Sequence, residues 1–256
     1  MTATATIPSH YQPAPDLLRG RVILVTGAGA GIGRAAALSF AGHGASVILM
    51  GRTVSKLEAV YDEIEAAGGP EPAIVPLDLM GARQEDYELT ASRIREAFGR
   101  LDGLLHNASV LGQRTPMELY DPETWNKVMQ INVNGPFLLT RACIPLLRES
   151  GDASLLWTAS SVGRKGRAYW GAYAVSKFAN EGMMQILADE LDDERHRIRV
   201  NSINPGATRT AMRQLAYPGE DPGVNPWPKD IMTPYLYLMG GDSEGVTGQA
   251  FDAQPK

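Results

Sequence analysis

The stretch Thr26-Gly27-Ala28-Gly29-Ala30-Gly31-Ile32-Gly33 decides the fold. It follows a short apolar run, Val22-Ile23-Leu24-Val25, and precedes a segment with helical spacing from Arg34 to His43. Glycines between a buried strand and a helix permit a tight turn, and they let a dinucleotide pyrophosphate approach bare backbone amides at the helix N-terminus. The turn is not a P-loop, because no Gly-Lys-Ser/Thr follows it. The residues predicted to bind a dinucleotide here are Gly27, Gly29, Gly31, Ile32 and Gly33.

The rest of the chain alternates between short apolar runs and segments with helical spacing. Further strands are predicted at 45–50, 73–77, 101–106, 153–158, 198–203 and 249–252, and helices at 54–67, 83–98, 122–149, 169–192 and 230–239. Apolar strands that alternate with helices are typical of a parallel sheet covered on both faces. We predict an α/β fold: a single Rossmann-like doubly wound domain with a mostly parallel seven-stranded sheet and helices on both faces. The domain is expected to span residues 20–256, after a loose N-terminal leader at residues 1–19.

Composition narrows the function classes. The 256 residues are 44% hydrophobic and 21% charged, and the net charge of −5 is spread without a long run of one sign, which disfavours a nucleic-acid surface. No stretch approaches the roughly 18 apolar residues of a membrane span, and the first residues lack the features of a signal peptide. We therefore expect no nucleic-acid or membrane partner and a cytoplasmic location. The single Cys143 cannot form an internal disulfide, and the four scattered histidines predict no metal site.

The end of the second predicted strand indicates which nucleotide is bound. An acidic residue there would bind the ribose 2′-hydroxyl of NAD, but this chain has Gly51-Arg52-Thr53. The planar guanidinium of Arg52 can pair with a 2′-phosphate. We therefore expect NADP(H) to be the preferred cofactor, with NAD(H) as the alternative.

Three side chains suggest the chemistry. Tyr173 and Lys177 are four residues apart, so they share one face of a helix. A nearby ammonium and a positively charged nicotinamide both favour the phenolate, so the pKa of Tyr173 is expected to fall toward working pH. Ser160 follows the strand that ends at Thr158, at the sheet edge where parallel α/β folds bind ligands. Its hydroxyl could donate to a substrate oxygen as negative charge develops there.

These residues, with Asn107-Ala108, Asn132 and Pro205-Gly206 with Thr208, have the order and spacing of the short-chain dehydrogenase/reductase family. The chain resembles that family from about residue 20 to 253, and segments such as Trp170-Gly171-Ala172-Tyr173 and 208–213 resemble the YciK-type oxidoreductases more closely. The resemblance implies an NAD(P)(H)-dependent oxidoreductase that transfers hydride between nicotinamide and a small carbonyl or alcohol substrate. It also implies a homodimer or homotetramer that pairs through the helices at 122–149 and 169–192.

The resemblance assigns roles to individual residues. Tyr173 would donate or accept the proton, Lys177 would hold the nicotinamide ribose and lower the pKa of Tyr173, and Ser160 would orient the substrate carbonyl. Asn132, through a locally distorted helix backbone, would hold a water in a proton relay. Asp78 would contact adenine, with Leu79 beside it, and Pro205, Gly206 and Thr208 would lie on the carboxamide side of nicotinamide. Asn107, followed by Ala108, would steady the sheet near the cofactor.

One position departs from the family pattern. Where the family usually has Asn-Asn-Ala-Gly, this chain has His106-Asn107-Ala108-Ser109, so Ser109 adds a side chain near the cofactor. The segment 207–230 lies where family members carry a mobile lid. Its Arg209 and Arg213 could contact substrate or could be solvated surface arginines.

Two other functions compete with the oxidoreductase. A non-catalytic regulatory protein that binds nicotinamide nucleotides would need the same glycine turn, although sensing requires no proton donor such as Tyr173. A methyltransferase could use a similar sheet, but it has no use for Ser160, Tyr173 and Lys177 together.

Overall fold

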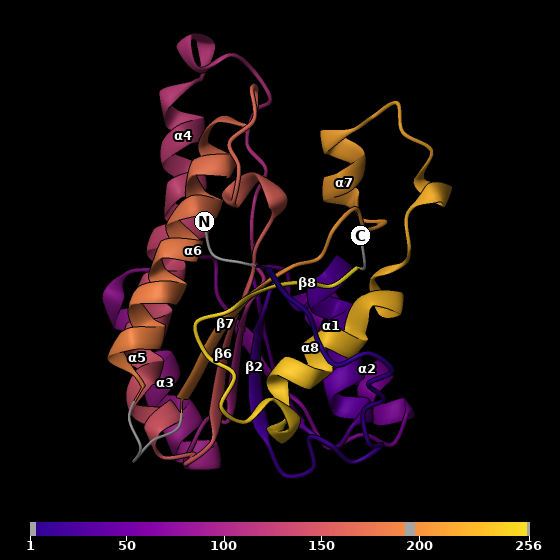
Figure 1. Cartoon of the computed structure of the whole chain (residues 1–256). Helices are drawn as coiled ribbons and strands as arrows, with labels where there is room; N and C mark the ends of the chain where they lie inside the picture. Colours follow the sequence, from indigo (N-terminus) through magenta and orange to yellow (C-terminus); the bar gives the residue numbers. More distant parts are fainter. Residues whose placement is uncertain (1–3, 193–197, 255–256) are drawn as a thin grey trace.

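The computed structural model describes residues 4–192 and 198–254, which form one open sheet of eight parallel strands (Figure 1). Every strand pairing in the sheet is parallel. In order across the sheet, the strands are β1 (Thr4–Ala5), β8 (Ala250–Asp252), β7 (Ile198–Asn204), β6 (Ala153–Thr158), β5 (Gly103–His106), β2 (Val22–Thr26), β3 (Ser46–Gly51) and β4 (Ala73–Pro76).

Helices cover both faces of the sheet, as predicted (Figure 1). One face carries α3 (Gln84–Phe98), α4 (Pro122–Met129), α5 (Gly135–Arg148) and α6 (Gly171–Glu190), and the other carries α1 (Gly31–Gly42), α2 (Val54–Ala66) and α8 (Met232–Met239). The strands β2, β5 and β6 are buried along their whole length, which explains their continuous apolar runs. The short helix α7 (Ala211–Ala216) stands apart from both layers. No helix among the described residues combines the length and the apolar character that a membrane crossing requires.

The sheet has eight strands rather than the predicted seven, because the leader contributes one. In β1, Thr4 pairs with Ala250 and Ala5 with Phe251. The leader is also not loose over its described part: the Tyr11 hydroxyl donates to the Asp242 carboxylate at 2.7 Å, and Leu18 is fully buried. The physical reason is that β8 would otherwise present unpaired backbone groups at the sheet edge.

The long helix predicted at 122–149 is interrupted. It begins as predicted, with the Asp121 carboxylate accepting from the backbone N–H of Thr124 at 2.8 Å and with Pro122 at the first helical position. A π-helical turn at Gln130–Asn134 then separates α4 from α5. Such turns frequently occur at functional sites. The local distortion that the family resemblance implied around Asn132 is therefore present.

Candidate active site

The glycine turn connects β2 to α1 and leaves the start of the helix bare. A Cβ atom at Gly33 would collide with the carbonyl oxygen of Gly27 and the side-chain amide of Asn107, so only glycine allows the two segments to pack this closely. Gly31 has a φ of 54°, in the left-handed region that favours glycine. Within this fully described segment, Ala30 offers no side-chain cap and the first turn carries no acidic residue. The free N–H groups at this end therefore suit an anion.

A cavity of about 280 Å³ lies beside this turn, at the ends of β2, β3 and β4. Arg52 and Lys56 line it together with Asp78 and Leu79. Arg52 is exposed and makes no ion pair with a described carboxylate. The glycine turn itself carries no basic residue, and the structure places a second cation, Lys56, on the first turn of α2. Two cations at this end suit a phosphorylated ribose.

The predicted adenine contact, Asp78, lies at the rim of the same cavity. One of its carboxylate oxygens accepts from the backbone N–H of Met80 at 3.1 Å, and this hydrogen bond stabilises the turn that follows Asp78. Leu79 is buried and supplies an apolar wall. The structure thus places Arg52, Asp78 and Leu79 around one cavity, as their predicted roles require.

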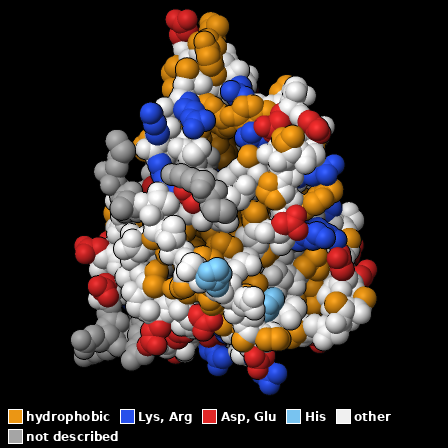
Figure 2. Space-filling model, turned by 45° about the vertical axis from the view of Figure 1, so that its right-hand side comes forward, with side chains coloured by type: hydrophobic (Ala, Val, Ile, Leu, Met, Phe, Trp, Pro, Cys, Tyr) orange, Lys and Arg blue, Asp and Glu red, His pale blue; other side chains and the backbone are white. Residues whose placement is uncertain are grey.

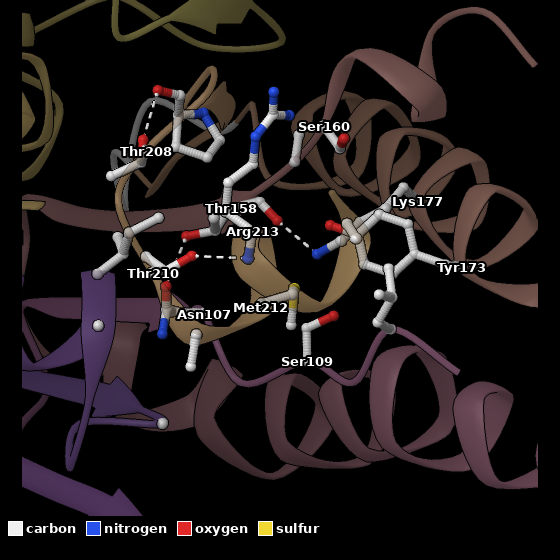
Figure 3. Close-up of a pocket in the computed structure, with 18 of the residues that line it drawn as sticks. Asn107, Ser109, Thr158, Ser160, Tyr173, Lys177, Thr208, Thr210, Met212 and Arg213 are labelled. Carbon is white, nitrogen blue, oxygen red and sulfur yellow. Dashed lines mark hydrogen bonds between the residues drawn. The ribbon is translucent and has the colours of Figure 1, made fainter. Parts of the chain in front are cut away.

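A second cavity, of about 330 Å³, extends from the other side of the glycine turn toward α7 (Figure 3). In the space-filling view, a hollow in the upper part of the molecule has largely hydrophobic walls and Lys or Arg side chains at its edge (Figure 2). The residues that line the second cavity include nearly all of the predicted nicotinamide and catalytic positions: Gly27, Gly31, Ile32, Asn107, Ala108, Ser160, Tyr173, Lys177, Pro205, Gly206 and Thr208.

Ser160, Tyr173 and Lys177 lie on one wall of this cavity. Tyr173 and Lys177 are buried, and the Lys177 ammonium donates to the Thr158 carbonyl oxygen at 2.8 Å. The same ammonium nitrogen lies 5.5 Å from the centre of the Tyr173 ring. Ser160 enters from the end of β6, and its hydroxyl is a hydrogen-bond partner of Tyr173. The hydroxyl, phenol and ammonium are therefore arranged in sequence along one surface (Figure 3).

The pKa of Tyr173 is shifted opposite to the expected direction. Burial raises the pKa of Tyr173 to about 12, and the hydrogen bond with Ser160 only partly opposes the rise. Burial lowers the pKa of Lys177 to about 8, while the charge of Glu181 acts to raise it. In the protein alone the expected fall is absent, because loss of hydration penalises the phenolate more than the hydrogen bond with Ser160 favours it; the expectation also included the charge of a bound nicotinamide. Tyr173 is thus a protonated, desolvated acid at neutral pH.

Asn132 connects the loop after β5 to α6, the helix that carries Tyr173 and Lys177. Its side-chain oxygen accepts from the Val110 N–H at 2.9 Å, and its amide nitrogen donates to the Val110 carbonyl oxygen at 3.0 Å and to the Ser176 hydroxyl at 3.0 Å. The Ser176 hydroxyl in turn donates to the Tyr173 carbonyl oxygen at 2.8 Å. These hydrogen bonds occupy the side chain of Asn132. Its backbone groups, which lie in the π-helical turn, are the part of the residue that remains for a functional role.

Thr26 fixes the segment after β5, a role that sequence reasoning missed. The Thr26 hydroxyl accepts from the backbone N–H groups of Asn107 and Ala108, at 2.9 and 3.0 Å. The Asn107 amide nitrogen donates back to the Thr26 carbonyl oxygen at 3.2 Å, and the Thr158 hydroxyl donates to the Asn107 amide oxygen at 3.3 Å. Asn107 therefore joins the ends of β2 and β6, as its predicted role requires.

The loop at Pro205, Gly206 and Thr208 is held from the C-terminal end of the chain. The side-chain nitrogen of Gln254 donates to the carbonyl oxygens of Pro205 and Ala207, both at 2.8 Å. The Thr208 hydroxyl donates to the Pro205 carbonyl oxygen at 3.2 Å. Gln254 and this loop are more than 40 residues apart in sequence, so their contact becomes apparent only in the folded structure.

The lid arginines have partners within the protein. Arg213 makes two hydrogen bonds to the Glu220 carboxylate, at 2.7 and 2.5 Å, and the Arg209 guanidinium lies 4.0 Å from the centre of the Trp227 ring. Arg114, for which the sequence carries no motif signal, reaches across from the loop after β5. Its guanidinium lies 4.6 Å from the Trp170 ring centre and 5.0 Å from that of Tyr217, and it donates to the carbonyl oxygen of Ala216.

The chain is similar in sequence and in structure to proteins that are already known. Residues 21–221 match the family model for short chain dehydrogenases. The chain is 55% identical over 246 residues to an uncharacterized oxidoreductase, YciK, of Escherichia coli strain K12, with 96% of each chain covered. A short chain dehydrogenase from Pseudomonas syringae is 59% identical, with a TM-score of 0.94 over 95% of this chain and 98% of that one. Another from Shigella flexneri 2a strain 301, complexed with NADP, is 55% identical, with a TM-score of 0.92 over 94% of this chain and 100% of that one.

Proposed function

The chain belongs to the short chain dehydrogenase family of oxidoreductases, and we propose that it transfers hydride between NADP(H) and a carbonyl or alcohol substrate with Tyr173 as the acid and base. The observation that carries this proposal is the arrangement of Ser160, Tyr173 and Lys177 along one wall of the second cavity. A purely regulatory nucleotide site has no need for a desolvated proton donor next to the space where a nicotinamide ring would lie.

In the reduction direction, Tyr173 gives its phenolic proton to the carbonyl oxygen while a hydride adds to the carbonyl carbon, so C=O becomes CH–OH. Bound NADPH would supply that hydride and become NADP⁺. The Ser160 hydroxyl donates a hydrogen bond to the oxygen on which negative charge develops. Lys177 favours the phenolate that remains on Tyr173, because its ammonium lies 5.5 Å from the ring centre.

The proton lost by Tyr173 has to be replaced from solvent. We propose that the Lys177 ammonium gives a proton to the Tyr173 phenolate and then regains one from a water held by the backbone of Asn132, which in turn takes a proton from solvent. The π-helical turn at Gln130–Asn134 supports this role, because it displaces the local carbonyl groups from regular helical bonding. The side chain of Asn132 holds this turn against α6 through Ser176.

The first test replaces the proposed proton donor. Tyr173→Phe keeps the buried ring and removes the hydroxyl, so kcat/KM for NADPH-dependent reduction of a carbonyl compound turned over by the parent should fall at least about a hundredfold. The dissociation constant for NADPH should stay within about threefold of the parent value. Tyr61→Phe, on α2, is the matched control and should leave both quantities unchanged. Parent-like turnover by Tyr173→Phe would disprove the assigned chemistry.

We propose that NADP(H) is preferred over NAD(H), because Arg52 and Lys56 line the cavity at the end of β3. The Shigella flexneri protein, which is 55% identical, is complexed with NADP, in line with this preference. Arg52→Gln should weaken NADPH binding about tenfold, as expected for one lost charge-assisted contact, and leave NADH binding unchanged. Fluorescence titration of both nucleotides measures this difference, and equal weakening of the two would contradict the role of Arg52.

We also propose that the chain forms a homodimer or homotetramer through the layer of α4, α5 and α6. Large apolar side chains are exposed on α5 and α6: Phe137, Val175, Phe178 and Ile186. Exposed apolar side chains that cluster on one face favour association. Light scattering of the parent should therefore give at least twice the mass of one chain, and Phe178→Glu should lower it. A parent that scatters as a single chain at working concentration would refute the proposal.

A further inference from the structure

Ser109 carries a buried hydroxyl that no described residue satisfies. Its Oγ atom is inaccessible to solvent and has no hydrogen-bond partner among the described residues. An unpaired buried hydroxyl costs about 1 to 3 kcal/mol, so such groups normally have a partner when the protein is at work. Ser109 also stands at the position where the family pattern has glycine, so this hydroxyl is a feature of the chain itself.

The segment that carries Ser109 is held on both sides. The N–H groups of Asn107 and Ala108 donate to the Thr26 hydroxyl, and the N–H of Val110 donates to the side chain of Asn132. The backbone therefore cannot readily move to bring Ser109 to a partner within the protein. The partner has to come to the hydroxyl.

Ser109 borders both cavities. Ser109 lines the cavity of Arg52 and Asp78, and it also lines the cavity of Tyr173 and Lys177. In the close-up of the second cavity, its oxygen points to the side where Tyr173 lies (Figure 3). A molecule that occupies both cavities has to pass this point.

We propose that Ser109 is an additional nucleotide-binding residue whose hydroxyl hydrogen-bonds the ribose attached to nicotinamide. This proposal rests on the proposed nicotinamide-nucleotide function. A ribose hydroxyl both donates and accepts, as does a serine hydroxyl, so the two groups are matched partners. Because NADPH and NADH share this ribose, Ser109 supports the binding of both, whereas Arg52 acts only on the 2′-phosphate of NADPH.

The test compares three ligands with the purified full chain: NADPH, NADH and adenosine 2′,5′-bisphosphate, which lacks the nicotinamide ribose. Ser109→Ala and Ser109→Gly should weaken NADPH and NADH by a similar factor, about three- to tenfold, and leave the bisphosphate unchanged. Arg52→Gln should show the complementary pattern, with weaker NADPH and bisphosphate binding and unchanged NADH binding. Ser161→Ala, an exposed serine close in sequence to the catalytic residues, is the matched control and should bind all three ligands like the parent.

A stability measurement separates binding from folding. Because the Ser109 hydroxyl is unpaired in the protein alone, Ser109→Ala should unfold at the same or a higher denaturant concentration than the parent when no nucleotide is added. The proposal is overturned if Ser109→Ala binds NADPH as the parent does, or if it loses affinity for the bisphosphate to the same degree. Failure of the parent itself to bind NADPH or NADH would instead overturn the proposed function.

Discussion

The Arg164 guanidinium lies 3.1 Å from the Glu181 carboxylate, and this ion pair joins the loop that follows Ser160 to the helix that carries Lys177. The same guanidinium contacts the Asp252 carboxylate at 2.8 Å. Glu181 lies one helical turn beyond Lys177, so it also faces the buried ammonium. The positive charges of Arg164 and Lys177 are therefore compensated by the negative charges of Glu181 and Asp252, next to the cavity wall that Ser160, Tyr173 and Lys177 form.

Removal of Glu181 should therefore destabilise the protein. Glu181→Gln removes one of the two negative charges that face the Arg164 guanidinium in a poorly hydrated site. Breaking a buried ion pair in this way costs about 3 kcal/mol of unfolding free energy. Denaturant unfolding monitored by circular dichroism measures the loss. The control is Glu149→Gln, which breaks the solvent-exposed pair of Arg95 and Glu149 and should change the unfolding free energy by less than about 0.5 kcal/mol. Similar changes in the two variants would contradict a structural role for the buried pair.

The buried ammonium of Lys177 should give the nucleotide-free protein a distinctive alkaline response. Burial lowers the folded-state pKa of Lys177 to about 8 from an ordinary value of 10.5, so the unfolded chain binds more protons between these values. Stability should consequently rise with pH through this window, by about 2 kcal/mol between pH 7.5 and 10. The Lys177→Met variant should lack this rise. Parallel stability curves for the parent and the variant would show that Lys177 is not desolvated in the folded state.

His106 should make the protein sensitive to mild acid. Its imidazole is fully buried, stacks on Trp157 and places Nε2 2.7 Å from the Thr140 hydroxyl oxygen. Burial lowers the pKa of His106 to about 3, so the folded state resists protonation, and stability is lost as pH falls below about 6.5. The parent should lose about 2 kcal/mol between pH 7.5 and 5 from this group. His106→Gln keeps an amide that can reach Thr140 and should lose correspondingly less, as acid titration of the unfolding free energy would reveal.

Arg114 should matter for substrate rather than for nucleotide. Its guanidinium lies over Trp170 and Tyr217, which line the second cavity, and donates to the carbonyl oxygen of Ala216 in α7. Two cation–π contacts of about 0.5 to 1 kcal/mol each predict that Arg114→Met raises KM for a carbonyl substrate about five- to thirtyfold. The dissociation constant for NADPH should be unchanged. Arg93→Gln, an exposed arginine on α3, serves as the control, and a loss of NADPH affinity in Arg114→Met would place this arginine in the nucleotide site instead.

Much of the fold could be predicted because its signals are local. Apolar runs such as Val22–Val25 and the glycine turn after them are contiguous in sequence, and they indicated both the parallel sheet and the nucleotide-binding family. The same holds for Tyr173 and Lys177, whose spacing on one helix places them on a common face. The family resemblance inferred from these motifs is confirmed by the match over residues 21–221.

The remaining features depend on segments far apart in the chain. Strand β1 was missed because two residues, Thr4 and Ala5, carry no periodic signal, and their pairing with β8 is a property of the finished sheet. The position of Arg114 over Trp170 and Tyr217 likewise joins three separate segments. The direction of the Tyr173 pKa could not be predicted from charge alone, because the deciding quantity is burial, which only the packed structure specifies.

The pairing of β1 with β8 determines the order in which parts of the protein can form during synthesis. Among the described strands, β1 neighbours only β8, which lies farthest along the chain, and Gln254 just beyond β8 holds the loop of Pro205 and Ala207. During synthesis, β1 therefore cannot join the sheet until β8 has been made and has paired with β7. A nascent chain that has already formed the glycine turn and α6 still lacks the residue that holds Pro205 and Ala207, so this wall of the second cavity is supported only when synthesis has reached Gln254.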